Sequence, residues 1–220
     1  AGPPPGTPGG SEESVGGLIG QWLDKDFFIS IDRQNAAAGE RFFLDCLDDP
    51  PRAHRLLRVV TDMFVDWTRA ARALDGVTTD TVLIADDHAG LLGPDLWPAF
   101  VLPYYRRITD ALGPRCWMHT ELVRRAHLPL FRDMDLVAIN YSEDQYLSPR
   151  DTLEELPGVP CGWHILTVAE MQQGTPEGIR RRYAELAGMG FPEIRCEMTV
   201  DTPVANVRAF LAAAREPGAG

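Results

Sequence analysis

Ionisable side chains that follow short apolar stretches are the residues of this chain best suited to chemistry. His119-Thr120-Glu121 comes directly after the apolar residues 116–118. Side chains two positions apart on a strand point to the same face, so His119 and Glu121 can reach one ion. A later predicted strand over residues 193–195 leads into Cys196, and imidazole, carboxylate and thiolate form a ligand set suited to Zn²⁺. We predict that His119, Glu121 and Cys196 bind zinc and leave a fourth position open for a substrate. The alternative is a histidine that only forms structural hydrogen bonds.

A second ionisable group, Asp86-Asp87-His88, follows the apolar residues 81–85. Adjacent side chains on a strand point to opposite faces, so only one of the two aspartates can face a pocket. We predict that Asp87 faces inward and that Asp86 caps a helix or forms an ion pair. Asp87, His88 and His164 are the candidates for catalytic roles, as groups that orient a substrate or move protons. His164 is also the best candidate for an additional metal ligand.

Polar residues at two further strand ends are the candidates for binding a small-molecule substrate. They are Asp32, Arg33 and Asn35 after the apolar residues 27–31, and Asn140 and Tyr141 after residues 135–139. The two remaining histidines, His54 and His127, lie on or beside predicted helices, where packing or surface roles are expected.

The elements that position these residues alternate along the chain. Apolar strand stretches alternate with segments that have an apolar face at helical spacing, which predicts a parallel sheet covered by helices. The expected strands span residues 27–31, 82–85, 116–118, 135–139, 161–163 and 193–195, and the expected helices span 50–73, 94–111 with a bend at Pro103, 149–156, 176–187 and 203–214.

The strands are short and end in polar residues, which favours a (β/α)₈-type TIM barrel over an open sheet. A complete barrel takes about 250 residues, and the six units counted here are two short of eight. The first two units are therefore expected to be lacking or altered, or to lie outside this chain. We predict a disordered tail or linker over residues 1–15, rich in Pro, Gly and Ser, and a single barrel domain over 16–216.

Composition excludes several classes of function. The 220 residues carry a net charge of -11, which argues against a nucleic-acid partner. No stretch of about 18 apolar residues predicts a membrane span, and no charged leader precedes an apolar segment. The four cysteines form no CxxC pair, so reduced thiols and a cytoplasmic location are expected.

The segment DDHAGLLGPDLWPAFVLPYYRRI resembles uroporphyrinogen decarboxylases and the related corrinoid-linked methyltransferases. Three further segments share the resemblance, which covers roughly residues 26–215: FFLDCLDDPPRAHRLLRVVTDMF, GTPEGIRRRYAELA and CEMTVDTPVANVRAFLAAAR. The family resemblance implies a (β/α)₈ barrel, of which this chain would match the last six units.

The two branches of the family differ at a position a few residues before the last helix. The decarboxylases have a histidine near this position, whereas the methyltransferases have a cysteine, as this chain does at Cys196. In the methyltransferases, an HxC pair and this later cysteine hold a zinc ion that activates a thiol. Here Glu121 replaces the first cysteine of that pair. The set His119, Glu121 and Cys196 is also similar to the zinc site of cobalamin-independent methionine synthases.

The resemblance implies a zinc-dependent, methyltransferase-like enzyme with a corrinoid protein or a folate as methyl donor. One alternative is a uroporphyrinogen decarboxylase-like lyase, in which Arg33 and Arg195 would bind a carboxylic acid and Asp87 would stabilise a cationic intermediate. Another alternative is a degenerate barrel that serves as a binding subunit. In that case a homodimer or a partner protein is expected, because an incomplete barrel exposes sheet edges.

Overall fold

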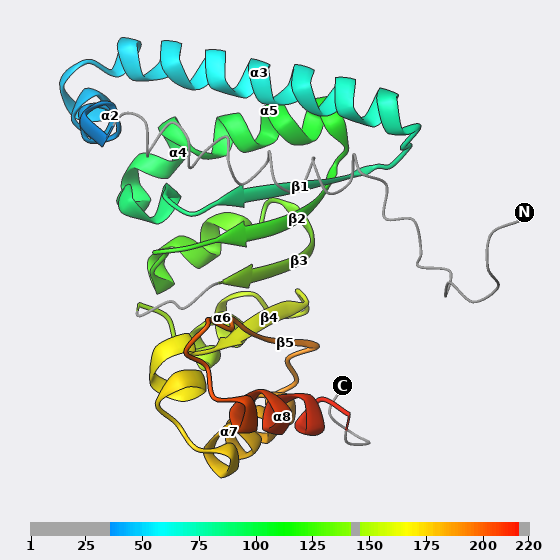
Figure 1. The fold of residues 1–220 in the computed structure, drawn as a ribbon. Helices are drawn as coiled ribbons and strands as arrows, with labels where there is room; N and C mark the ends of the chain where they lie inside the picture. Colours follow the sequence, from blue (N-terminus) through cyan, green and yellow to red (C-terminus); the bar gives the residue numbers. More distant parts are fainter. Residues whose placement is uncertain (1–35, 142–145, 216–220) are drawn as a thin grey trace, which may run out of the picture. The chain divides into compact units, whose positions relative to one another are not determined.

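The computed structural model describes residues 36–141 and 146–215 (Figure 1). The predicted tail over 1–15, the predicted strand over 27–31 and the candidate substrate-binding residues Asp32, Arg33 and Asn35 lie outside the described residues. The chain divides into two compact units after Asp80, and each is described by itself. The single domain expected over 16–216 stays a prediction.

The first unit contains two helices, α2 (Ala36–Asp48) and α3 (Pro50–Asp75). Asp49 caps α3 by accepting a hydrogen bond from the Arg52 amide at 3.2 Å. Gly76 ends the helix in the left-handed conformation with φ of 67°, which glycine adopts without strain. These bounds confirm the helix that the sequence predicts over 50–73.

The second unit is built on a five-stranded sheet in which every neighbouring pair is parallel and the strands follow one another in chain order. This is the arrangement of consecutive βα units and confirms the expected α/β class. The strands are β1 (Thr81–Asp86), β2 (Arg115–Thr120), β3 (Asp135–Tyr141), β4 (Cys161–Ile165) and β5 (Glu193–Cys196).

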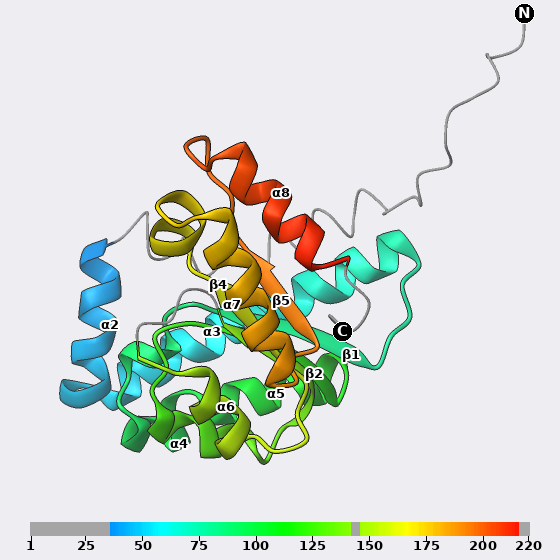
Figure 2. The same ribbon diagram turned by 90° about the horizontal axis from the view of Figure 1, so that it is seen from below.

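Helices lie between successive strands and pack beside them (Figures 1 and 2). Helix α5 contacts β1, α6 contacts β4, α7 contacts β4 and β5, and α8 packs on α7. Their bounds are α4 (Trp97–Phe100), α5 (Leu102–Leu112), α6 (Pro149–Glu155), α7 (Pro176–Gly188) and α8 (Val204–Ala213). Shorter helical turns are η1 (Ala89–Leu91), η2 (Pro94–Leu96), η3 (Arg125–Phe131) and the π-helix η4 (Thr167–Gln172).

The helix expected over 94–111 is divided at Val101. Helix α4 ends at Phe100 and α5 begins at Leu102, with Pro103 in its first turn. Proline lacks the amide hydrogen that a continuous helix needs, but it fits the first turn of a new one. The bend is therefore a break two residues before the proline.

Two further expectations concern the whole chain. No helix among the described residues has the length and apolar character needed to cross a membrane. Each of the four cysteines is free, and Cys46, Cys116 and Cys161 are buried.

Candidate functional site

Asp87, His119 and Glu121 meet where strands β1 and β2 end. The two strands pair in register up to Asp86 and Thr120, and the Glu121 amide continues the ladder to the Asp86 carbonyl at 3.4 Å. Nε2 of His119 lies 3.4 Å from Oδ1 of Asp87 and 3.6 Å from Oε1 of Glu121. One ligand atom from each of the three side chains lies within 4.8 Å of the others. The structure therefore brings together three of the predicted site residues.

The other ring nitrogen of His119 faces β3. Nδ1 lies 2.5 Å from Oδ1 of Asn140, an oxygen that only accepts hydrogen bonds, so Nδ1 carries a hydrogen. Nε2 is consequently the atom that faces the two carboxylates. A hydrogen bond of this kind fixes the ring orientation of histidines that bind metals in proteins.

The surroundings of His119 raise its pKa. The ring is buried, and burial alone would lower the pKa because it disfavours the charged imidazolium. The nearby carboxylates of Asp87 and Glu121 and the hydrogen bond with Asn140 outweigh burial and raise the pKa of His119 to about 9. Without a cation, the cluster holds a proton on Nε2 between two carboxylates, and a cation would have to replace that proton.

Asp86 points away from this cluster and has structural partners. Its Oδ1 accepts hydrogen bonds from the amides of His88 at 3.0 Å and Ala89 at 2.8 Å, and its Oδ2 accepts one from the Tyr105 hydroxyl at 3.0 Å. Burial raises the pKa of Asp86 despite these donors, and it also raises that of Tyr105. Asp86 and Asp87 thus have different surroundings, in line with the alternation of side chains along a strand, and the helical turn that follows has His88, not Asp86, at its N-cap.

Neighbouring residues on β3 have different surroundings. Asn140 lies at the site, whereas Tyr141 packs its ring against Trp163 with centroids 6.0 Å apart in the core. The structure therefore places Asn140 against His119 and Tyr141 among aromatic side chains. Binding of substrate by either residue stays a prediction.

The other histidines are not among the three residues of this cluster. His164 is buried in β4, where it pairs in register with Arg195. His88 precedes the turn η1 and its amide bonds to Asp86. His127 is fully buried, with Nε2 2.9 Å from the Leu92 carbonyl oxygen and its ring centroid 4.9 Å from that of Trp97, as expected of a packing residue.

Cys196 is not part of the three-residue cluster. It ends β5 and pairs in register with Ile165 of β4, three residues after Glu193. Because side chains alternate along a strand, Cys196 lies on the face of β5 opposite to Glu193. Burial raises the pKa of its thiol, which disfavours the thiolate that a metal would bind. A role for Cys196 as a zinc ligand stays a prediction.

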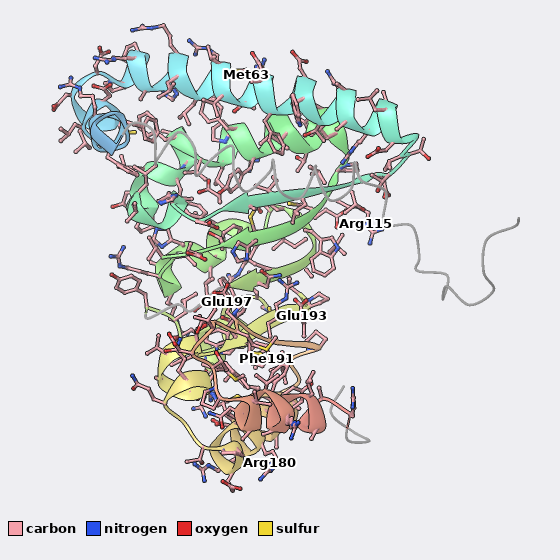
Figure 3. All side chains as sticks on the ribbon, viewed as in Figure 1. Met63, Arg115, Arg180, Phe191, Glu193 and Glu197 are labelled. Carbon is pink, nitrogen blue, oxygen red and sulfur yellow. The ribbon has the colours of Figure 1, made fainter. Side chains whose placement is uncertain are left out.

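Glu193 belongs to the site and was missed by the sequence analysis. Its Oε2 accepts a hydrogen bond from Nδ2 of Asn140 at 3.4 Å, and its Oε1 lies 2.5 Å from Nη2 of Arg195 (Figure 3 labels Glu193). The one signal in the sequence is Gly162, because a glycine inside a strand marks a place where another group comes close.

The chain matches a known protein family over most of its length. The family model described as uroporphyrinogen decarboxylase (URO-D) matches residues 34–217. The chain belongs to the URO-D family. This confirms the resemblance of the sequence and the fold class expected from it.

Two similar proteins come from Methanosarcina mazei. A methylated-thiol–coenzyme M methyltransferase is 23% identical over 172 residues, which are 76% of this chain and 46% of that protein. A solved structure of a methyltransferase shares the fold with a TM-score of 0.59 at 16% identity, covering 79% of this chain and 52% of that one. The chain thus spans about half the length of these relatives.

Proposed function

We propose that this URO-D family chain forms a metal-dependent, methyltransferase-like enzyme site that binds a thiol or a similar soft nucleophile. The observation that carries the proposal is the orientation of His119. Its Nδ1 is held by Asn140, and its Nε2 faces the carboxylates of Asp87 and Glu121. The similarity to a methylated-thiol–coenzyme M methyltransferase supports a thiol as the methyl acceptor.

The donor atoms fit a divalent cation. One imidazole nitrogen and two carboxylate oxygens are ligands that Zn²⁺ accepts, and three protein ligands leave a position for a substrate. Asp87, His119 and Glu121 would hold the ion, and Cys196 is the candidate for a further ligand. When bound, a zinc ion would supply positive charge that lowers the pKa of a substrate thiol.

The chain's own residues would do the remaining work. Asn140 keeps the imidazole ring of His119 in one orientation, and the two carboxylates balance the charge of a cation. We assign proton transfer and substrate orientation to His88 and His164. The methyl donor would be a corrinoid protein or a folate.

Zinc binding tests the proposal. Protein loaded with zinc and dialysed is expected to retain one equivalent, and His119→Gln or Glu121→Gln is expected to weaken binding by at least about 100-fold. Asp133→Asn is the control, because Asp133 is exposed and its charge lies at a surface pair with Arg106 at 3.8 Å. X-ray absorption of Cys196→Ser beside the unchanged protein shows whether sulfur is a ligand.

Equal zinc retention in all these variants would contradict the metal site. The decarboxylase-like lyase would then be the better reading of the family, and turnover of a porphyrinogen would support it. Arg195, the candidate for binding a carboxylate in that reading, is paired with Glu193 at 2.5 Å. This pairing favours the methyltransferase-like reading.

A further inference from the structure

Four positions on neighbouring strands lie at one level of the sheet. His119 on β2 pairs in register with Asn140 on β3, Asn140 pairs with Gly162 on β4, and Gly162 pairs with Glu193 on β5. Paired residues of adjacent strands point to the same face, so the row brings one imidazole, one amide and one carboxylate together.

Gly162 is the position in this row that lacks a side chain. A Cβ atom there would lie 2.5 Å from Oε2 of Glu193 and 2.8 Å from Cβ of Asn140, both too close for real atoms. The glycine therefore leaves the space through which Glu193 of β5 reaches across β4 to Asn140 of β3.

The contact with Glu193 decides which way the Asn140 amide faces. A carboxylate only accepts hydrogen bonds, so it selects the NH₂ group of Asn140, with Nδ2 3.4 Å from Oε2. The amide oxygen must then face His119, where it accepts from Nδ1 at 2.5 Å. If the amide of Asn140 were reversed, its oxygen would face the carboxylate of Glu193. Two oxygens that only accept hydrogen bonds would then repel each other, so this orientation is disfavoured.

We propose that Glu193 is a positioning residue which acts through Asn140 to hold Nε2 of His119 toward Asp87 and Glu121. The inference deepens the proposed function and rests on it for the role of Nε2. Arg195 keeps the carboxylate in place from the other side through its 2.5 Å contact with Oε1. Gly162 is required because its missing side chain is what permits the contact.

The first experiment follows the His119 ring directly, without any metal. In chelator-treated protein labelled with ¹⁵N-histidine, the Nδ1–H proton of His119 is expected to give a resolved, slowly exchanging NMR signal, identified by its loss in His119→Gln. Glu193→Ala and Gly162→Ala are expected to speed its exchange with water at least tenfold. Glu177→Ala is the matched control, since Glu177 is an exposed glutamate paired with an arginine, Arg180, at 2.9 Å.

The second experiment separates positioning from a merely structural role. Glu193→Ala is expected to weaken zinc binding about tenfold, and Asn140→Ala by about 10–100-fold. In an Asn140→Asp background, Glu193→Ala is expected to cause no loss. A carboxylate at 140 presents an acceptor to Nδ1 whichever way it turns, and removing Glu193 also removes a repelling charge.

Glu193→Gln is the conservative variant and is expected to recover most of the affinity, because its amide oxygen can still accept from Asn140. Equal losses from Glu193→Ala in both backgrounds, or an unchanged Nδ1–H signal in Glu193→Ala, would overturn the inference. If the signal depends on Glu193 but no variant or parent protein binds zinc, the positioning stands and the proposed metal-dependent function falls.

Discussion

His119 combines two properties at the scale of one residue: a fixed ring and a retained proton. Asn140 fixes Nδ1, and the two carboxylates favour a proton on Nε2, which raises the pKa to about 9. The folded protein therefore binds this proton more tightly than the unfolded chain, whose histidines have a pKa of about 6.5. Stability and metal binding both depend on the same nitrogen atom.

The pH dependence of unfolding tests this state. In chelator-treated protein, the contribution of His119 is expected to be fully present below about pH 6.5 and to be lost as pH rises through about 9. The loss amounts to roughly 3 kcal/mol in the free energy of unfolding. Denaturant titrations between pH 6 and 10 measure it, and His119→Gln should flatten this part of the curve. Parallel curves for the two proteins would contradict a charged His119.

Asp86 and Asp87 show how alternation separates structure from chemistry between adjacent residues. Replacing Asp86 with alanine leaves the amides of His88 and Ala89 and the Tyr105 hydroxyl without their acceptor in a buried place. We expect Asp86→Ala to lower the free energy of unfolding by about 2–4 kcal/mol. Chemical denaturation measures the loss, and Tyr105→Phe, which removes one of these bonds, should cost only about 1 kcal/mol. Similar losses of stability for Asp86→Ala and Tyr105→Phe would contradict the role of Asp86 as the acceptor for all three donors.

Hydrogen bonds at the scale of elements hold helix α8 against the connection between β4 and α7. Asn206 of α8 is buried and donates through Nδ2 to the carbonyl oxygens of Met171 at 2.9 Å and Gly174 at 3.0 Å. Both acceptors lie in or just after the π-helix η4. One side chain thus attaches α8 to the connection between β4 and α7.

Substitution of Asn206 tests this attachment. Asn206→Ala removes both donors from buried carbonyl oxygens and is expected to lower the free energy of unfolding by about 2–3 kcal/mol. Gln172→Ala is the control, because its contact with Thr199 at 2.7 Å is exposed, and a change within about 0.5 kcal/mol is expected. Equal effects of the two substitutions in urea titrations would contradict the role of Asn206.

The sequence predicts elements better than it predicts their register. Apolar spacing predicts a helix over 50–73 and strands over 82–85 and 116–118, because these patterns are local. The structure has the corresponding elements at Pro50–Asp75, Thr81–Asp86 and Arg115–Thr120. The HxE pair placed His119 beside Glu121 for the same reason. Contacts across strands depend on register, which no local pattern carries, so the approach of Glu193 to Asn140 could not be foreseen.

At the scale of the whole molecule, the described strands leave the sheet with two edges, β1 and β5. Strand β5 has β4 on one side and no partner among the described strands on the other. An open edge presents unpaired amide and carbonyl groups, which proteins cover with another strand, a helix or a partner. The chain also spans about half the length of its relatives from Methanosarcina mazei.

Sedimentation tests the expectation that a partner covers this edge. The 24.4 kDa chain is expected to sediment as a homodimer or larger assembly at micromolar concentration, because the edge of β5 has no described partner. A folded monomer at all concentrations would contradict the expected homodimer and leave the edge to a different partner.

The ladder between β3 and β4 is the narrowest in the sheet. Among the described residues, the register pairs there are Ile139 with Cys161 and Asn140 with Gly162, whereas β1 and β2 pair from end to end. The contact between Asn140 and Glu193 spans this short ladder and adds a side-chain link between β3 and β5. A small molecule that touches residues of both β3 and β4 would protect the amides of this ladder, so deuterium uptake at β3 and β4 would report binding before any reaction is known.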